Sequence, residues 1–325
     1  MACFHPLTGA RFPGTKDKLS FGKNILPGME EIKVRCGQCV GCRLDHSSMW
    51  AIRAMHESKS HEDTCFVTLT YDDENMPEDR SVSKRPIQIF FKSLRNHLTR
   101  NQPGKKIKYI ACGEYTEKKT RPIGPFNPWE YIGEGQRPHY HAIIFGIDFH
   151  DKKLWSVRNG NRIYTSDVLT NIWGQGHCTV GAVTYESAAY VARYSLKKIN
   201  GSLKDKPDEI TGLLPYERTC QYTGQIIEVE QERFHTSNGL GKEFYEKYKT
   251  DIYPQDRVIV RQHETRPPRY YDYLFDAEEP NIMEEIKNRR IIEMQKHEAD
   301  NTPARLRDRE KVKLAQLKQL KRVLE

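Results

Sequence analysis

The stretch "GEGQRPHYHAIIFG", residues 133–146, carries two histidines one residue apart, directly before an apolar run. A short run of this kind is typical of a buried β-strand. Because alternate side chains of a strand share a face, His139 and His141 are expected on one side of a sheet and Tyr140 on the other. Two neighbouring imidazoles gain little from packing, but together they can bind a divalent cation. The stretch therefore predicts a sheet with a metal site on one face.

The segments around this strand predict an alternation of strands and helices. Strands are expected at 64–71, 106–115, 139–149 and 177–185, and helices at 85–100, 165–174 and 186–199. The first six elements follow the order βαββαβ, which is that of a ferredoxin-like, RRM-like palm. The expected fold class is therefore α+β, with an antiparallel sheet and an additional helix that carries catalytic side chains. The Pro- and Gly-rich stretch 116–136 is expected to be a loop or an irregular hairpin between two adjacent strands.

The domain organisation is expected to comprise four parts of the 325-residue chain. A Cys-rich arm with a helix occupies 1–62, the palm 63–200, and an accessory α/β segment 201–275. Residues 276–325 are almost wholly charged and contain no Gly, which predicts a charged helical tail. Such a tail is expected to be a solvated helix, or disordered until it meets a partner.

The composition narrows the class of protein. The formal net charge of +8 favours a polyanionic partner such as nucleic acid. No apolar run reaches about 18 residues, and the N-terminus lacks an apolar leader, so neither a membrane span nor a signal peptide is predicted. A reducing cytoplasm is expected, where the eight cysteines are thiols or metal ligands rather than disulfides. A phosphate-binding G-x-x-x-x-G-K-[ST] loop is missing, which argues against a built-in ATPase motor.

A carboxylate is expected to complete the histidine site. Glu114 stands at the end of the strand 106–115. If that strand pairs with the one that carries His139 and His141, the three side chains form a mixed nitrogen and oxygen site. Such a site suits Mg²⁺ or Mn²⁺ at a phosphate. Asp72 and Asp73 are the alternatives for the third ligand.

The helix predicted at 186–199 combines an apolar face with a reactive one. At about 100° per residue, Tyr190, Tyr194 and Lys197 fall within roughly 60° of arc. A phenol is a competent nucleophile toward phosphorus when a cation stabilises the phenolate. The product would be a 5′-phosphotyrosyl DNA ester and a free 3′-hydroxyl, and two tyrosines would allow one to hold an end while the other attacks. The residues expected on the opposite, apolar face are Ala188, Val191, Ala192 and Ile199.

A cysteine cluster predicts a second metal site near the N-terminus. Cys36, Cys39 and Cys42 follow the spacing C-x2-C-x2-C, which lets neighbouring thiolates reach one ion. A structural zinc needs four ligands, for which Cys3 is the first candidate and His46 the second. The spacing alone also permits an iron–sulfur cluster. The remaining cysteines, expected as small apolar core residues, are Cys65, Cys112, Cys178 and Cys220.

These motifs occur together in one known family. His139-Tyr140-His141 resembles the HUH motif of rolling-circle replication initiators, "YVARYSLKK" (190–198) their paired-tyrosine motif, and "FVTLTYDDENMP" (66–77) their first, strand-ending motif. Together with "CGQCVGCRLDHSSMWAIRAMHE" (36–57), the chain resembles the replication initiation proteins of gokushoviruses, single-stranded DNA phages of the Microviridae. The resemblance covers about residues 30–200.

The resemblance implies a palm-like ferredoxin-type fold and site-specific nicking of the phage replicative form. It also implies rolling-circle synthesis by host polymerase and helicase in the bacterial cytoplasm, followed by rejoining. The substrate is expected to be single-stranded or extruded origin DNA. The roles that it implies are metal binding by His139, His141 and Glu114, nucleophilic attack by Tyr190 and Tyr194, assistance by Lys197 or less favourably Lys198, and phosphate contacts from Arg193 and Lys198.

Two other functions remain open from the sequence. One is an RRM-like protein with a zinc knuckle that binds nucleic acid without cutting it. The other is an HUH transposase or relaxase, although relaxases usually carry a further histidine in the motif that this chain does not show.

Overall fold

The computed structural model describes residues 3–15, 17–116, 120–121, 130–131, 137–194, 205–208, 212–219 and 224–319. The chain forms two compact units. The sheet unit comprises Trp50–Lys249, and the cysteine unit comprises Met1–Met49 with Thr250–Arg322. The four segments predicted from the sequence follow the chain rather than these units, and that division stays a prediction.

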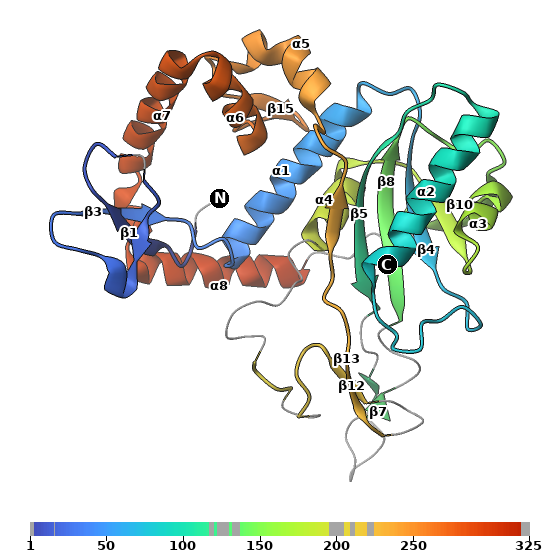
Figure 1. The fold of residues 1–325 in the computed structure, drawn as a ribbon. Helices are drawn as coiled ribbons and strands as arrows, with labels where there is room; N and C mark the ends of the chain where they lie inside the picture. The colour runs from blue at the N-terminus through green and yellow to red at the C-terminus, as the bar shows by residue number, and fades with distance from the viewer. Residues whose placement is uncertain are drawn as a thin grey trace. The chain divides into compact units, whose positions relative to one another are not determined.

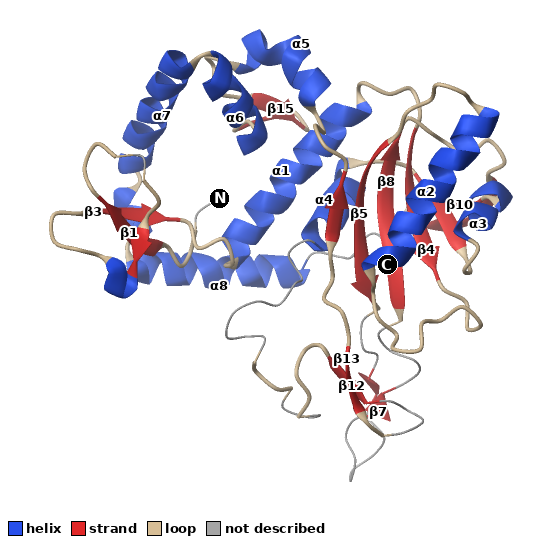
Figure 2. Cartoon of the chain, viewed as in Figure 1, coloured by secondary structure: helices blue, strands red, loops and turns tan. Residues whose placement is uncertain are grey.

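The sheet unit is built on a seven-stranded antiparallel sheet with the order β14-β5-β8-β4-β11-β10-β9 (Figures 1 and 2). An α+β class with an antiparallel sheet was predicted, and it is confirmed. The strands are β4 (Thr64–Thr70), β5 (Lys108–Tyr115), β8 (Pro138–Phe145), β9 (Lys153–Arg158), β10 (Asn161–Thr165), β11 (Cys178–Gly181) and β14 (Phe234–Thr236).

Helices cover both faces of this sheet. On one face lie α2 (Lys84–Asn101), drawn in front of the sheet in Figure 1, and α3 (Asp167–Trp173). The other face packs against α1 (Val40–Ser58) and α4 (Tyr185–Tyr194). The amphipathic spacing explains α2, because its buried residues recur every three or four positions, and each contributes roughly 1.5–3 kcal/mol by burial. These residues are Ile87, Phe90, Phe91, Leu94 and Leu98.

The hairpin β9–β10 was not predicted. It inserts between β8 and α3 and extends the sheet beyond β11. Its register pairs Arg158 with Asn161, so the connection is the two-residue turn Asn159-Gly160. Both turn residues have positive φ, 49° and 79°, as a type I′ turn requires. The Asn-Gly pair between two apolar-polar runs is the sequence signal that could have found this hairpin.

The remaining elements are short sheets and helices. None of the helices in the described part of the chain combines the length and apolarity needed to cross a membrane. The strand pairs and sheets are β1 (Leu7–Arg11), β2 (Ser20–Phe21) and β3 (Glu30–Val34); β6 (Thr120–Arg121) with β7 (Glu130–Tyr131); β12 (Glu217–Thr219) with β13 (Ile226–Glu228); and β15 (Val258–Val260) with β16 (His263–Thr265). The helices are η1 (Gly22–Asn24), α5 (Lys242–Ile252), α6 (Arg269–Glu278), α7 (Pro280–Gln295), η3 (Glu298–Asn301) and α8 (Pro303–Gln319).

The charged tail is helical, as predicted, but the expectation of a merely solvated or disordered tail is wrong. Met283 and Ile286 of α7 are buried, and Leu306 of α8 packs against Phe4 and the cysteine cluster. Arg290 of α7 binds the carboxylates of two aspartates, Asp256 and Asp272. Three apolar residues and one buried arginine network are therefore enough to fix these helices within the cysteine unit. A pattern search sees mainly the exposed charges of such helices.

Gly113 of β5 is needed because the neighbouring layer leaves no room for a side chain. A Cβ at this position would lie 2.0 Å from Val82 Cγ1 and 3.2 Å from Tyr140 Cε1, both in buried residues. We expect Gly113→Ala to lower the free energy of unfolding by roughly 1–3 kcal/mol through overpacking. The matched control is Gly181→Ala in β11, where the nearest atom is Phe66 Cδ1 at 3.6 Å. Equal urea midpoints for the two variants would contradict this account.

Candidate metal and nucleophile site

The candidate site lies on the two central strands of the sheet. In the register of β5 with β8, Glu114 stands opposite His139 and Cys112 opposite His141. Tyr140 belongs to the apolar layer under α2, whereas Ile143 and Phe145 belong to the layer under α1 and α4. The alternation of a strand therefore places both histidines on the α4 face, as predicted.

The three side chains meet at one carboxylate oxygen. Glu114 Oε2 lies 3.5 Å from His139 Nε2 and 3.4 Å from His141 Nε2. One donor atom from each residue lies within 4.8 Å of the others. Donors around a cation with bonds of about 2.1 Å are roughly 3.0–3.4 Å apart, so a modest contraction would enclose an ion. The donor set of two nitrogens and one oxygen fits Mg²⁺ or Mn²⁺.

Burial strengthens the case for a cation. Glu114 is 3% exposed and His141 is 6% exposed. A buried carboxylate is costly unless a positive charge or hydrogen bonds compensate for lost hydration. The alternative ligands lie elsewhere, since Asp73 is on the surface in an ion pair with Arg137, and Asp72 accepts hydrogen bonds from Asn75.

Second contacts orient the two imidazoles. His139 Nδ1 donates to the carbonyl oxygen of Arg137 at 3.3 Å, and His141 Nδ1 lies 3.0 Å from Thr68 Oγ1. The ring of His141 also stacks on Phe66, with centroids 5.6 Å apart. Contacts at Nδ1 leave Nε2 of each ring directed at Glu114, which is the arrangement that metal-binding histidines need.

The helix α4 brings a phenol to this group. Its start is held by reciprocal hydrogen bonds, from Thr184 N to Ser187 Oγ at 2.8 Å and from Ser187 N to Thr184 Oγ1 at 3.1 Å. Ala188 and Val191 are buried against the sheet. Tyr190 Oη then donates to Glu114 Oε2 at 3.3 Å, and the Tyr190 ring meets the ring of His141 edge-on with centroids 5.1 Å apart.

Several predicted residues lie outside what the structure describes. Lys197, Lys198 and Cys220 are not among the described residues, and of Arg193 and Tyr194 only the backbone in α4 is described. Tyr194 follows Tyr190 by four residues, about one helical turn. The roles predicted for these residues therefore stay predictions. The other three cysteines expected in the core, Cys65, Cys112 and Cys178, are all buried.

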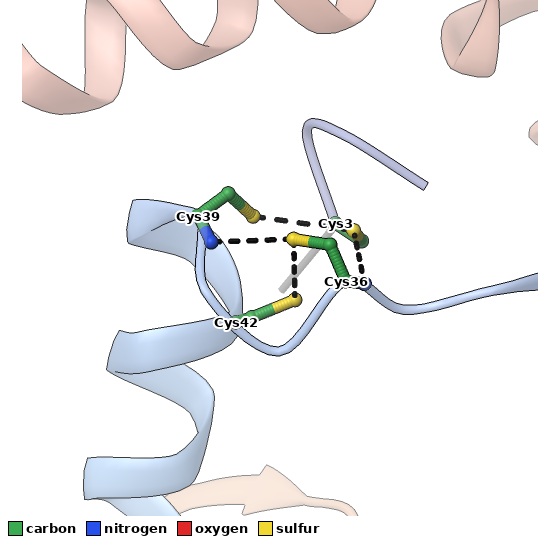
Figure 3. Close-up of side chains that lie close together, drawn as sticks. All are labelled: Cys3, Cys36, Cys39 and Cys42. Atoms are coloured by element: carbon green, nitrogen blue, oxygen red, sulfur yellow. Dashed lines mark hydrogen bonds between the residues drawn. The ribbon is translucent and has the colours of Figure 1, made fainter. Parts of the chain in front are cut away.

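The cysteine unit holds a second group of potential ligands (Figure 3). Cys3, rather than His46, joins Cys36, Cys39 and Cys42, and the four sulfur atoms lie within 4.8 Å of one another. The Cys36–Cys42 and Cys3–Cys39 sulfur pairs are both 4.0 Å apart. Thiolates bound tetrahedrally at about 2.3 Å to zinc are about 3.8 Å apart, so this arrangement fits a zinc ion closely.

Backbone amides already favour thiolates in this cluster. Phe4 N and Cys36 N donate to the sulfurs of Cys39 and Cys3 at 3.3 Å, and Cys39 N donates to Cys36 Sγ at 3.2 Å. Burial opposes ionisation of Cys39, but the amide donors outweigh it and lower the pKa of this thiol to about 7. Burial raises the pKa of Cys3 to about 12. A bound cation would supply the charge that keeps all four sulfurs deprotonated.

Metal content tests this cluster directly. We expect the purified chain to hold one zinc ion, and Cys39→Ser to lose it and to destabilise the cysteine unit, because three thiolates bind far more weakly than four. Cys178→Ala is the control, since Cys178 is buried in the sheet unit away from the cluster. Elemental analysis with thermal unfolding reads out both effects. Zinc retained by Cys39→Ser would contradict the assignment, and stoichiometric iron would favour an iron–sulfur cluster.

Comparisons with known proteins agree with this geometry. The family model of the replication-associated protein ORF2 group matches residues 64–122 and 126–199. The chain is 29% identical to replication-associated protein VP4 of Bdellovibrio phage phiMH2K over 91% of this chain and 85% of the relative. It is 31% identical to replication-associated protein ORF2 of Spiroplasma virus 4 over 75% of this chain and 68% of the relative. It is 25% identical to replication-associated protein ORF4 of Chlamydia phage 1 over 76% of this chain and 55% of the relative. No solved structure matches the chain.

Proposed function

Given that the chain belongs to the replication-associated proteins of the Microviridae, a family of rolling-circle replication initiators, we propose that it cuts origin DNA by tyrosine transesterification. The observation that carries the proposal is the place of Tyr190. Its phenol oxygen lies 3.3 Å from Glu114 Oε2, beside the imidazoles of His139 and His141. A nucleophile and a phosphate-binding group are thus within reach of one phosphodiester.

The strand order supports a ferredoxin-like palm for the sheet unit. The four strands of the predicted βαββαβ unit lie in the order β5-β8-β4-β11, with α2 between β4 and β5 and α3 between β8 and β11. The split βαβ arrangement has this connectivity. We therefore assign the sheet unit to this fold, extended by β14 at one edge and by the β9–β10 hairpin at the other.

The proposed step forms one bond and breaks one. The oxygen of Tyr190 attacks phosphorus in line with the 3′ oxygen of the preceding nucleotide, and the P–O3′ bond breaks as the P–O bond to tyrosine forms. The phenol proton leaves along the hydrogen bond to Glu114 Oε2, and the 3′ oxygen takes up a proton from solvent. The products are a 5′-phosphotyrosyl ester and a free 3′-hydroxyl. Because the ester conserves the bond energy, the reverse reaction rejoins the strand without ATP.

The residues around the phenol have distinct tasks. Glu114, His139 and His141 would hold Mg²⁺ or Mn²⁺, which when bound neutralises charge on the non-bridging oxygens of the phosphate. Thr68 and the Arg137 carbonyl orient the two imidazoles. The predicted roles of Tyr194 as second nucleophile, of Lys197 as the assisting lysine, and of Arg193 and Lys198 at flanking phosphates belong to this proposal.

The proposed partners follow from the products. A free 3′-hydroxyl primes synthesis, so a host polymerase and a host helicase would act after the cut, in the bacterial cytoplasm. The substrate would be single-stranded or extruded origin DNA, because the phenol must reach a backbone unshielded by a paired strand. The Cys3–Cys42 cluster would bind structural zinc and stabilise the cysteine unit.

A covalent adduct tests the proposal. Wild-type protein incubated with Mn²⁺ and the circular single-stranded phage genome should form a protein–DNA species that survives a denaturing gel. The same mixture with a chelator should form none. Binding without any covalent species, under conditions where the protein is folded, would contradict the proposal and favour a non-catalytic RRM-like protein. Adducts formed equally at many unrelated sequences would favour a transposase-like enzyme.

A further inference from the structure

A pocket of about 720 Å³ adjoins the metal group on the same face of the sheet. His141 and Thr68 line one end, and Trp155, Arg158 and Arg162 of the β9–β10 hairpin line the other. The pocket therefore runs from β8 across β4, β11 and β10 to the edge strand β9. At about 4.8 Å per strand, these four steps span roughly 19 Å, a distance that a few nucleotides of an extended strand can follow.

The lining is chemically suited to a nucleic acid strand. The guanidinium groups of Arg158 and Arg162 form no ion pair with a carboxylate in the described part of the chain. Asp167, the acidic residue of the lining, is paired with Lys153 at 2.7 Å, which offsets its charge. Hydroxyl groups that can donate to phosphate and base oxygens come from Thr68, Thr70, Thr165, Thr170, Thr179 and Thr184.

Trp155 is the most unusual residue of this lining. It is 59% exposed, so its indole contributes little to the core. The guanidinium of Arg158 lies 5.8 Å from the centroid of its ring. An exposed indole beside a cation, above a groove with hydroxyl groups, is the combination on which unpaired bases stack.

We infer that this pocket binds the single-stranded DNA flanking the scissile phosphate, with a base stacked on Trp155 and adjacent phosphates bound by Arg158 and Arg162. The inference rests on the proposed function for the identity of the phosphate at His141. A paired base has no free face to offer, so the hairpin selects unpaired DNA. The β9–β10 hairpin thus acts as a clamp that fixes the direction in which the strand leaves the metal group.

Neighbouring residues of β9 provide matched controls. Leu154 is 58% exposed, nearly as much as Trp155, but it does not line the pocket. Lys153 carries the same charge as Arg158 and is also outside the lining. The comparison therefore sets Trp155→Ala against Leu154→Ala, and Arg158→Ala against Lys153→Ala. All four side chains are on the surface, so the variants should unfold at the wild-type temperature.

The experiment measures fluorescence anisotropy of a labelled oligothymidylate of about 20 nucleotides, with a chelator present so that no cleavage occurs. We expect Trp155→Ala to weaken binding roughly 5- to 100-fold, and Leu154→Ala to change it less than about twofold. On an abasic strand of the same length, Trp155→Ala should have no effect. Arg158→Ala and Arg162→Ala should each reduce the salt dependence of log K by about one, and Lys153→Ala should leave it unchanged.

Wild-type affinity in Trp155→Ala and in Arg158→Ala would overturn the inference, and so would equal losses on the abasic strand and the normal strand. An association of chains through β9 that Trp155→Ala abolishes while DNA affinity stays normal would overturn it as well. These outcomes are separate from the proposed cleavage. Failure of the proposed function would appear as a missing covalent adduct in wild-type protein with Mn²⁺, whatever the hairpin variants do.

Discussion

Replacing both Tyr190 and Tyr194 with Phe should abolish covalent capture of DNA. The double variant lacks both phenols that are proposed to become phosphotyrosine, and loss of an enzyme's nucleophile costs roughly 10⁴–10⁶ in rate. The rings remain, so packing of α4 against the sheet is expected to survive. The measurement is the yield of the covalent species on a denaturing gel, after a time course with the circular single-stranded phage genome and Mn²⁺.

Single variants separate the roles of the two tyrosines. Tyr190→Phe removes the phenol that lies 3.3 Å from Glu114, and we expect it to impair capture strongly. Tyr194→Phe is expected to impair rejoining or a second cut, because the second phenol would accept the DNA end in the following round. Tyr185→Phe, in the first turn of the same helix, is the matched control and should capture DNA normally. Undiminished capture by the double variant would remove the mechanism.

Glu114→Gln should lose the divalent cation and, with it, cleavage. The amide has the size and shape of the carboxylate but no charge, so it removes the negative ligand between His139 and His141. Loss of an outer partner of a metal ligand already costs roughly 10- to 100-fold in affinity, and loss of a ligand should cost at least as much. Titration with Mn²⁺, followed by electron paramagnetic resonance, measures the free ion directly.

The control for this prediction is Asp73→Asn. Asp73 was an alternative ligand on sequence grounds, but its side chain is 85% exposed and paired with Arg137. We expect Asp73→Asn to bind Mn²⁺ with wild-type affinity. A folded Glu114→Gln variant with unchanged Mn²⁺ affinity, or an Asp73→Asn variant that loses the ion, would show that the ligand assignment is wrong.

Much of the site could be predicted because its parts are local in sequence. The H-x-H spacing places both histidines on one face of a strand whatever the rest of the fold does. Glu114 was harder, since its place depends on the register that sets it opposite His139. That register could be expected from strand order, but the 3.4–3.5 Å approach of its oxygen to both rings could not.

The parts that were missed depend on contacts distant in sequence or on weak local patterns. The β9–β10 hairpin has short strands whose residues are mostly exposed, so its hydrophobic pattern is faint and only Asn159-Gly160 marks it. The tail was expected to be solvated because charges dominate its composition. Its order rests on a few residues such as Leu306, whose partners Phe4 and Cys39 lie at the other end of the chain. Periodicity within one segment carries no information about such partners.

The most direct test of the account is to locate the DNA on the protein. The covalent species formed with Mn²⁺ should be digested with nuclease and protease, and the modified peptide sequenced by mass spectrometry. We expect a nucleotide attached through a 5′ phosphate to Tyr190, with a minor fraction on Tyr194. Attachment to a residue outside α4, or cleavage that leaves a 5′ phosphate on free DNA and nothing on the protein, would contradict it.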